Sequence, residues 1–505
     1  MKLPAPVFNA RPRLLATLRV SAAILTLAAL IGFGTVGYNV APVYYWFMLT
    51  ALVPATAYFL LRRAAARARI RAEAQKRWTQ DGPAVQRVRY TRFDVLRGTY
   101  AEATREESRG YVDDRTWDDL GMDEICDQMD VCFTIAGRNE LHRALRHAVP
   151  DEAELRRRRE QTSAFLADVS YREVNARLLA GIGEEPDADP ASILFNDTVR
   201  PDRLYPLFIT MALLAVAAVA ITAVVQPTLG LFSIVAVFLV NMWIYYRKAR
   251  HISADIPALR ILSRIMQSAR RMPIRLTEPS VTRGVRGAFR WLLTGAPTPT
   301  PSFSGDIVEM IFTYIKIYFQ IDLIAYERIV GYIKAHRASY RELYQAVGSL
   351  DAAFALAAFR NRTTLVCDAE ITDGAQTAGG PALHLVSVYH PLVPEAVANS
   401  IRFQRPGAII TGTNMAGKST FLRTVGINVL VAQTAGFAFA GSYRGPRLVV
   451  LSSINKRDDL EAGKSFYYDE AERIFRLIEG ANGDTPALLL IDELLSGTNS
   501  LEREG

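Results

Sequence analysis

Residues 411–420 read Thr411-Gly-Thr-Asn-Met-Ala-Gly-Lys-Ser-Thr420, and this stretch decides the fold of the C-terminal region. It fits the pattern G-x-x-x-x-G-K-[ST], in which backbone N–H groups bind phosphate oxygens at the positive end of the following helix. An apolar run at 408–410 precedes it, and a helix-compatible stretch at 421–430 follows it. The sequence therefore predicts a strand, a phosphate-binding loop and a helix, in that order, with ATP and Mg²⁺ as the expected ligands.

The residues of this loop have separate predicted roles. Lys418 is expected to reach the β- and γ-phosphates, and the Ser419 hydroxyl is expected to complete the ligand shell of Mg²⁺. The predicted nucleotide-binding set is Gly412, Thr413, Asn414, Met415, Ala416, Gly417, Lys418, Ser419 and Thr420.

A second motif further along the chain complements the loop. Leu488-Leu-Leu-Ile-Asp-Glu493 is an apolar run that ends in two carboxylates. Asp492 is expected to hold Mg²⁺ through its water shell, and Glu493 to orient or deprotonate the attacking water. An apolar run before Asp-Glu is common and mostly structural, but downstream of a phosphate loop it predicts ATP hydrolysis, with Glu493 and Lys418 as catalytic residues.

Four hydrophobic segments carry no charged residue and form two pairs: 20–38 with 43–61, and 204–225 with 229–246. Each is near the ~20 residues that a helix needs to cross a bilayer. Four buried core helices are the alternative. Arginines flank both pairs and the two short turns carry no charge, so the positive-inside rule places both termini and both large polar regions in the cytoplasm. The favoured interpretation is a multi-pass protein of the inner or plasma membrane.

The composition gives little support for a nucleic-acid-binding, disulfide-rich or zinc-binding protein. The 505 residues carry a net charge of +8, but much of the excess is arginine beside the hydrophobic segments. The positive charge is therefore weak evidence for nucleic-acid binding. The three cysteines and six histidines have no metal-like spacing, so neither a disulfide framework nor a zinc site is expected.

The remaining segments read as helices and a linker. The region 62–203 is helical in pattern, and its charged run at 151–159 is typical of a solvated helix face. The basic stretch within 251–294 is compatible with contact to anionic lipid, with contact to DNA and with exposure to solvent alone. The three prolines of 295–305 predict a linker. Polar residues recur on one face of 307–335, which predicts one long amphipathic helix of a helical core.

Around the nucleotide motifs the sequence resembles one family. Gly412-Thr-Asn-Met-Ala-Gly-Lys-Ser-Thr420 resembles the loop G-P-N-M-x-G-K-S-T of the MutS ATPases. Asp458-Asp-Leu460 with Gly463-Lys-Ser465 and Glu470 looks like the signature segment of that family. Further similar pieces are Ala432-Gln433, Phe437 with Ala440, His390-Pro391, Val397-Ala-Asn-Ser400, and Asp492-Glu493 followed by Gly497-Thr498.

The resemblance extends upstream to the helical region. Asp130-Val-Cys-Phe-Thr-Ile-Ala-Gly137 is similar to the start of the MutS core, and Leu350-Asp351 resembles the lever that enters the ATPase domain. In that family the ATPase domains pair, so the resemblance implies a homodimer in which Ser465 acts in trans on the γ-phosphate. It also implies DNA as a partner of the helical core. The hydrophobic hairpins resemble a membrane-anchored MutS-like subgroup.

The expected fold is therefore mixed. It combines transmembrane α-helical hairpins, an all-α MutS-like core and lever, and a C-terminal α/β P-loop NTPase domain of the ABC type. The predicted regions are an N-terminal transmembrane hairpin (1–67), a cytoplasmic helical region (68–203), a second transmembrane hairpin (204–246), a helical core and lever (247–364) and the ATPase domain (365–505).

Departures from the family pattern limit what the resemblance implies. Thr413 replaces the usual proline and Ala416 a usual glycine, and no Phe-x-Glu wedge precedes residue 120, so mismatch repair itself is not expected. The family continues past the position of Gly505 with further strands and a switch histidine, so the ATPase domain is expected to be truncated and to turn over poorly. An ABC-type membrane regulator or transporter, and a scaffold that binds nucleotide without turnover, are the alternatives.

Overall fold

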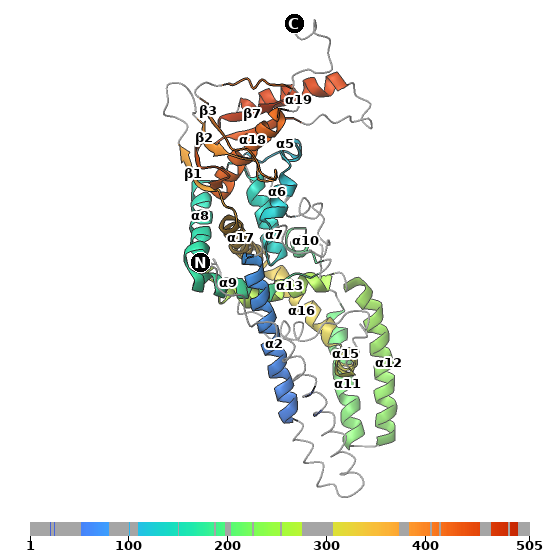
Figure 1. Ribbon diagram of the computed structural model, residues 1–505. Helices are drawn as coiled ribbons and strands as arrows, with labels where there is room; N and C mark the ends of the chain where they lie inside the picture. The colour runs from blue at the N-terminus through green and yellow to red at the C-terminus, as the bar shows by residue number, and fades with distance from the viewer. Residues whose placement is uncertain are drawn as a thin grey trace. The chain divides into compact units, whose positions relative to one another are not determined.

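The computed structural model describes most of the chain and shows a mainly helical protein with strands in its C-terminal part (Figure 1). Contacts divide it into two compact units, residues 1–80 and 81–505. The described residues are 21, 25, 52–79, 100, 110–149, 151–185, 188–196, 204–224, 227–252, 255–274, 307–372, 383–403, 407–413, 416–454, 466–482 and 485–492.

In the first unit, helix α2 (Leu52–Thr79) begins inside the second predicted span and continues through the arginine-rich segment. Alanine and arginine are strong helix formers, and no glycine or proline interrupts this segment after residue 54. The boundary predicted at residue 67 therefore falls inside a continuous helix. The predicted span 20–38 lies outside the described residues except for Ser21 and Leu25.

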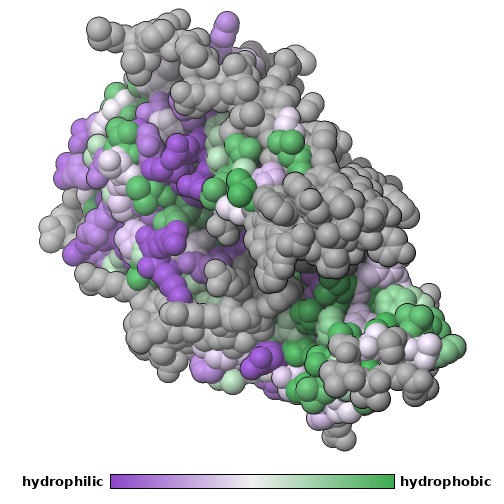
Figure 2. All heavy atoms as spheres, turned by 90° about the horizontal axis from the view of Figure 1, so that it is seen from below, coloured by the Kyte–Doolittle hydropathy of each residue, from purple (hydrophilic) through white to green (hydrophobic). Residues whose placement is uncertain are grey.

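The second hydrophobic pair forms the hairpin of α11 (Tyr205–Val224) and α12 (Pro227–Ile252), close to the predicted bounds. Within the described residues, two helices are long and apolar enough to cross a membrane, over Tyr205–Thr222 and Gly230–Lys248. Soluble core helices pass the same test, so this alone is weak evidence. Only 17% of each stretch is buried, however, and Figure 2 shows hydrophobic side chains gathered over this hairpin.

The long helix predicted over 307–335 is wrong, because it is broken into α15 (Ile307–Tyr318) and α16 (Ile321–Ala335). Gln320 at the break has a left-handed backbone with φ of 53° and is fully buried. The Asn241 amide of α12 donates to the Tyr318 carbonyl at 2.6 Å, and the Gln320 amide donates to the Asn241 carbonyl at 2.7 Å. These bonds to α12 offset the strain of the break.

The helical core is arranged around α17 (Arg337–Arg362), which packs against α7 (Ile135–Arg146) and α8 (Glu152–Ala167). Every residue of α17 from Leu350 to Phe359 is buried. The other helices of the core region are α5 (Asp114–Asp119), α6 (Met122–Met129), α9 (Val169–Ile182), α10 (Pro190–Phe195) and α13 (Asp255–Ala269).

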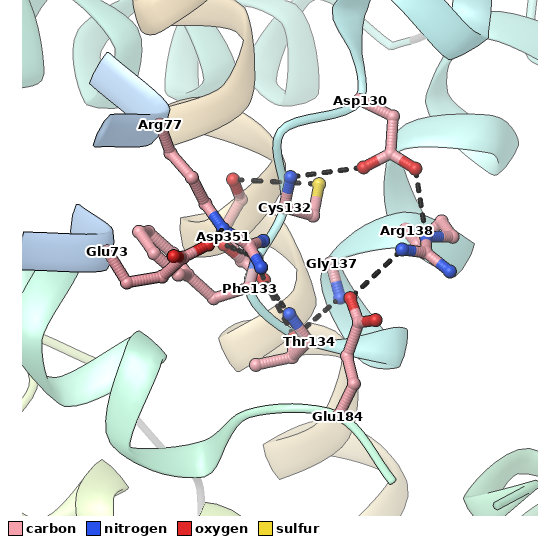
Figure 3. Close-up of polar contacts among 10 residues, drawn as sticks. All are labelled: Glu73, Arg77, Asp130, Cys132, Phe133, Thr134, Gly137, Arg138, Glu184 and Asp351. Atoms are coloured by element: carbon pink, nitrogen blue, oxygen red, sulfur yellow. Dashed lines mark hydrogen bonds and ion pairs between the residues drawn. The ribbon is translucent and has the colours of Figure 1, made fainter. Parts of the chain in front are cut away.

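A buried carboxylate joins α17 to the N-terminus of α7 (Figure 3). Asp351 accepts hydrogen bonds from the backbone N–H of Phe133 at 3.0 Å and of Thr134 at 2.8 Å, and from the Thr134 hydroxyl at 2.7 Å. Thr134 in turn caps α7 by accepting from the Gly137 N–H at 3.0 Å. These donors and the positive end of the α7 dipole stabilise a charge that burial would otherwise disfavour. The two segments singled out by the MutS resemblance are thus in direct contact.

A second buried network continues from the same loop. Asp130 accepts from the Cys132 N–H at 3.0 Å and pairs with Arg138 at 2.8 Å, and Arg138 also pairs with Glu184. Burial, with Asp130 and Asp351 nearby, raises the pKa of the Cys132 thiol, which therefore stays neutral. The thiol is thus a packed, neutral group of the helical core.

The C-terminal region contains two sheets. The larger has the order β3-β2-β5-β1-β4 and the smaller pairs β6 with β7 in parallel. Helix α18 (Lys418–Ala435) contacts strands of both sheets, and α19 (Phe466–Ala481) forms the crossover between β6 and β7. The strands are β1 (Cys367–Thr372), β2 (Leu383–Val388), β3 (Asn399–Phe403), β4 (Phe437–Ala438), β5 (Ser442–Pro446), β6 (Val449–Ser453) and β7 (Ala487–Ile491).

The close approach of α7 and α17 predicts a strong effect of Gly348→Ala. A Cβ atom on Gly348 would lie 2.6 Å from the Ala136 carbonyl oxygen, a backbone atom of α7. The two helices must separate, so we expect a loss of about 1–3 kcal/mol in the free energy of unfolding. Denaturant unfolding of the purified chain measures it.

Gly181→Ala is the matched control, since Gly181 of α9 has no atom within 4 Å of an added Cβ. That variant should be neutral or more stable by about 0.5–1 kcal/mol, because alanine is the better helix former. Equal stability of the two variants would show that α7 and α17 are not held at this distance.

Candidate functional site

The phosphate-loop residues lie at the N-terminus of α18. Gly417 precedes the helix with φ of +85°, a left-handed conformation that favours glycine. The first turn carries no acidic residue, and residues 411–413, 416 and 417 are exposed. The helix thus presents backbone N–H groups and a positive dipole end to solvent, which suits an anionic ligand.

The structure brings the two predicted metal ligands together. The Ser419 hydroxyl, in the first turn of α18, donates a hydrogen bond to the carboxylate of Asp492. Asp492 directly follows β7, and its N–H donates to the Ser453 carbonyl of β6 at 2.9 Å. A hydroxyl and a carboxylate side by side form the kind of oxygen donor set that Mg²⁺ prefers.

Lys418 is directed back onto the loop. Its amine donates to the carbonyls of Gly412 at 2.8 Å and Thr413 at 3.3 Å. Backbone carbonyls are weaker partners for an ammonium group than a phosphate, because hydrogen bonds between two charged groups are the stronger ones. The amine is therefore next to the loop and available for exchange onto a phosphate oxygen.

The strand predicted at 408–410 is absent from the structure. Residues 407–413 have no regular secondary structure, and the Ile409 side chain is 92% exposed. Strands require hydrogen-bonded neighbours, and in the described part of the chain β6 and β7 pair only with each other. The apolar run is therefore left without a partner, although the loop and the helix follow as predicted.

Several predicted site residues lie outside the described residues: Asn414, Met415, Ser465 and Glu493. The signature segment at 458–465 and the Gly497-Thr498 pair lie outside them as well. The roles assigned to these positions stay predictions. Thr420 is described and begins α18 with Lys418 and Ser419.

Other residues that carried the family resemblance have structural roles around α18. The Gln433 side chain donates to the Leu448 carbonyl at 2.7 Å and accepts from its N–H at 3.0 Å, which fixes α18 to the start of β6. Burial and the nearby Arg423 lower the pKa of His390, so its imidazole is neutral near pH 7. His390 follows β2 and lies outside any strand.

Two arginines of α8 bind backbone carbonyls of the C-terminal region, one at the end of α18 and one in β1, and sequence reasoning missed both. Arg158 is buried and donates to the Thr434 carbonyl at 2.9 Å, and Arg159 donates to the Ala369 carbonyl of β1 at 2.8 Å. The prediction of a solvated face for 151–159 is therefore wrong at these positions. The only sequence signal is the helical spacing of Arg158 with Leu155, which is also buried.

Glu154 holds Arg158 in place from the same helix. Its carboxylate pairs with Arg158 and with Arg143 of α7. Burial alone would raise the pKa of Glu154, but the two arginines lower it to about 2. The Glu154 carboxylate is thus ionised throughout the physiological range. It holds the guanidinium of Arg158 at the C-terminal end of α18, where the helix dipole favours a cation.

Comparison with known proteins identifies the C-terminal segment. Residues 408–504 match the family model of MutS domain V. The chain is 35% identical over 127 residues to the DNA mismatch repair protein MutS of Thermus aquaticus, which is 24% of this chain and 15% of that protein. It is 28% identical over 170 residues to the probable mismatch repair protein Msh6 of Drosophila melanogaster, or 32% of this chain and 14% of that protein.

A third relative is the endonuclease MutS2 of Streptococcus gordonii, 29% identical over 180 residues, which cover 35% of this chain and 22% of the relative. The chain thus spans under a quarter of the length of these relatives. The matched segment is an ATPase domain of the MutS type, and the match implies that it binds ATP. The predicted resemblance is confirmed for this domain, and nothing in these comparisons supports the membrane-anchored subgroup.

Proposed function

We propose that the chain is a membrane-anchored, MutS-type ATPase that works as a dimer with Mg²⁺-ATP and changes the position of its helical core with nucleotide state. The observation that supports this most directly is the contact between Ser419 and Asp492 at the N-terminus of α18. It joins the two nucleotide motifs through the side chains that would hold the metal ion. When bound, Mg²⁺ would neutralise charge that develops on the phosphates.

In this proposal the protein groups have distinct tasks. The N–H groups of the loop and the Lys418 amine bind the phosphates, and Glu493 orients or deprotonates the attacking water. Ser465 of the second subunit completes the site in trans. Helix α19 begins at Phe466, directly after this serine.

DNA is the proposed partner of the helical core. The relatives are named as DNA mismatch repair proteins and an endonuclease, and the resemblance at 130–137 and 350–351 includes the core. An anchored chain is restricted in how it scans DNA. Binding of DNA that reaches the membrane surface therefore fits the proposal better than mismatch repair does.

Lys418→Ala should abolish ATP binding, since it removes the cation that pairs with the β- and γ-phosphates. Binding of a fluorescent ATP analogue to the full chain in lipid nanodiscs measures the affinity. Lys334→Ala is the control, because Lys334 is an exposed lysine of α16 and should leave binding unchanged. Retained affinity in Lys418→Ala would refute the phosphate-loop assignment.

Glu493→Ala should leave ATP binding intact and slow hydrolysis by about 10²–10⁴-fold, the usual contribution of a positioned general base. Single-turnover release of phosphate measures the chemical step separately from product release. Unchanged turnover in the variant removes Glu493 from the mechanism. A wild-type chain that binds ATP and releases no phosphate would instead support the nucleotide-binding scaffold.

The surface of the α11–α12 hairpin supports the membrane anchor. Large hydrophobic side chains such as Leu213 (64% exposed) and Phe232 (77% exposed) face outward. Near the end of α12, Arg247 lies 5.3 Å from the centre of the Trp243 ring, and Lys248 follows. Tryptophan and basic residues at the end of an apolar helix are typical of the cytoplasmic membrane interface.

A spin label at Leu213→Cys tests whether this hairpin lies in lipid. In nanodiscs the label should be accessible to oxygen, which dissolves in the bilayer, and protected from a water-soluble nickel chelate. A label at Val169→Cys, on a residue of α9 that is 56% exposed, should show the reverse order. Both variants carry Cys367→Ser, since the other two cysteines are buried. Equal chelate access at the two sites would rule out the anchor.

A second candidate function is that of a membrane regulator or transporter. Its support is a set of buried polar groups where α12 meets the break between α15 and α16. Lys316 and Asp322 lie 4.0 Å apart and are both buried, beside Asn241 and Gln320. Ionisable groups next to membrane helices often mark a functional pathway. ATP turnover that is stimulated by a solute in sealed vesicles, and not by DNA, would favour this candidate.

A further inference from the structure

Helix α5, which lies outside the matched ATPase segment, docks on that domain through Asp119. The residue is 4% exposed, and Asp119 and Arg473 form an ion pair across the two regions. A buried carboxylate at such a contact requires several donors to offset its lost hydration.

The donors come from two elements of the ATPase domain. The Asp119 carboxylate accepts from the Ser452 hydroxyl at 2.8 Å, from the Ile454 N–H at 2.9 Å and from the guanidinium of Arg473. Ser452 lies near the end of β6, Ile454 directly follows that strand, and Arg473 lies in α19. A third element uses the backbone, because Arg423 of α18 donates to the Asp119 carbonyl at 2.9 Å.

Each of these elements carries or supports one nucleotide motif. Arg423 is one helical turn beyond Ser419 of the phosphate loop. Strand β6 pairs with β7, and its Ser453 carbonyl accepts from the N–H of Asp492. Helix α19 follows the signature segment. Asp119 therefore joins the elements behind all three motifs. Its carboxylate contacts the β6 region and α19, and its backbone carbonyl contacts α18.

Packing strengthens the same contact. A Cβ atom at Gly426 of α18 would lie 2.7 Å from the Leu120 side chain and 2.6 Å from the Leu490 side chain of β7. Leu120 and Leu490 thus meet over a glycine of the phosphate-loop helix. The Thr116 hydroxyl of α5 also accepts from the Ser452 N–H at 3.1 Å. The segment 116–120 therefore packs on both β6 and α18.

We propose that Asp119 is a positioning residue of the ATP site, which sets β6, and through it Asp492, together with α19 relative to the phosphate loop. The inference rests on the proposed ATPase function. Binding of ATP depends mainly on the loop and α18, whereas turnover depends on the placement of Asp492 and Glu493 and on the signature segment. Loss of the Asp119 charge should therefore affect catalysis more than affinity.

The test compares Asp119→Asn with Asp114→Asn in the full chain in nanodiscs. Asp114 lies on the same helix, has a side chain that is 65% exposed and pairs with Arg146 outside the ATPase domain. We expect Asp119→Asn to lower kcat at least about 10-fold and to change the affinity for a fluorescent ATP analogue less than about 3-fold, since one charge-assisted contact is lost. Asp114→Asn should match the wild type in both.

Variants of the two residues whose side chains bind Asp119 test the proposal independently, in case Asp119→Asn folds poorly. Ser452→Ala removes one hydrogen bond to Asp119 and should lower kcat less than Asp119→Asn does. Arg473→Gln should lower it to a similar extent as Asp119→Asn, and the double variant should lose no more than the worse single one, because the two residues act as a unit. Wild-type kcat in Ser452→Ala and Arg473→Gln, with only a lower melting temperature, would overturn the positioning role.

Hydrogen exchange without nucleotide separates this inference from the proposed function. Asp119→Asn should increase deuterium uptake in peptides that cover β6 and β7, and Asp114→Asn should not. Unchanged uptake overturns the inference whether or not the protein hydrolyses ATP. Increased uptake in a chain that shows no ATPase activity would refute the proposed function and leave the support of β6 by Asp119 in place.

Discussion

The buried carboxylate of Asp351 is the contact on which the helical core depends. It satisfies two backbone donors and one hydroxyl at the start of α7, and it does so from the middle of α17. The contact requires that the two helices approach closely, which Gly137 and Gly348 permit. Because α17 leads directly to β1, the position of the ATPase domain on the core is set from the same point.

The core holds the phosphate-loop helix at its far end as well. Arg158 of α8 binds the Thr434 carbonyl in the last turn of α18, whereas Ser419 and the loop lie at its first turn. Asp119 contacts the same helix through Arg423. A shift of α18 along its axis on nucleotide binding would thus act on α8 and α5 together. Helix α8 is linked to α7 by the ion pair of Glu154 with Arg143. Helix α5 is linked to α7 by the ion pair of Asp114 with Arg146 and by the ring contact of Trp117 with His142.

Local patterns predicted the parts of the fold that depend on local chemistry. The loop glycines, the α18 helix, the hairpin of α11 and α12 and the meeting of Ser419 with Asp492 all follow from motifs whose spacing has a physical reason. What was missed depends on partners distant in the sequence. Arg158 looks like its exposed neighbour Arg156, and Asp119 lies in an ordinary acidic helix, so only the contacts to Thr434 and Ser452 distinguish them. The break at Gln320 likewise depends on Asn241.

The break between α15 and α16 also attaches the α11–α12 hairpin to the rest of the second unit. Its polar groups are bonded to Asn241 of α12, and the Tyr318 hydroxyl donates to the Ala215 carbonyl of α11 at 3.2 Å. Deletion of residues 204–252 would uncover Lys316, Gln320 and Asp322 and leave the break unsupported. The hairpin is therefore an integral layer of the second unit, and its deletion would not leave the rest of that unit intact.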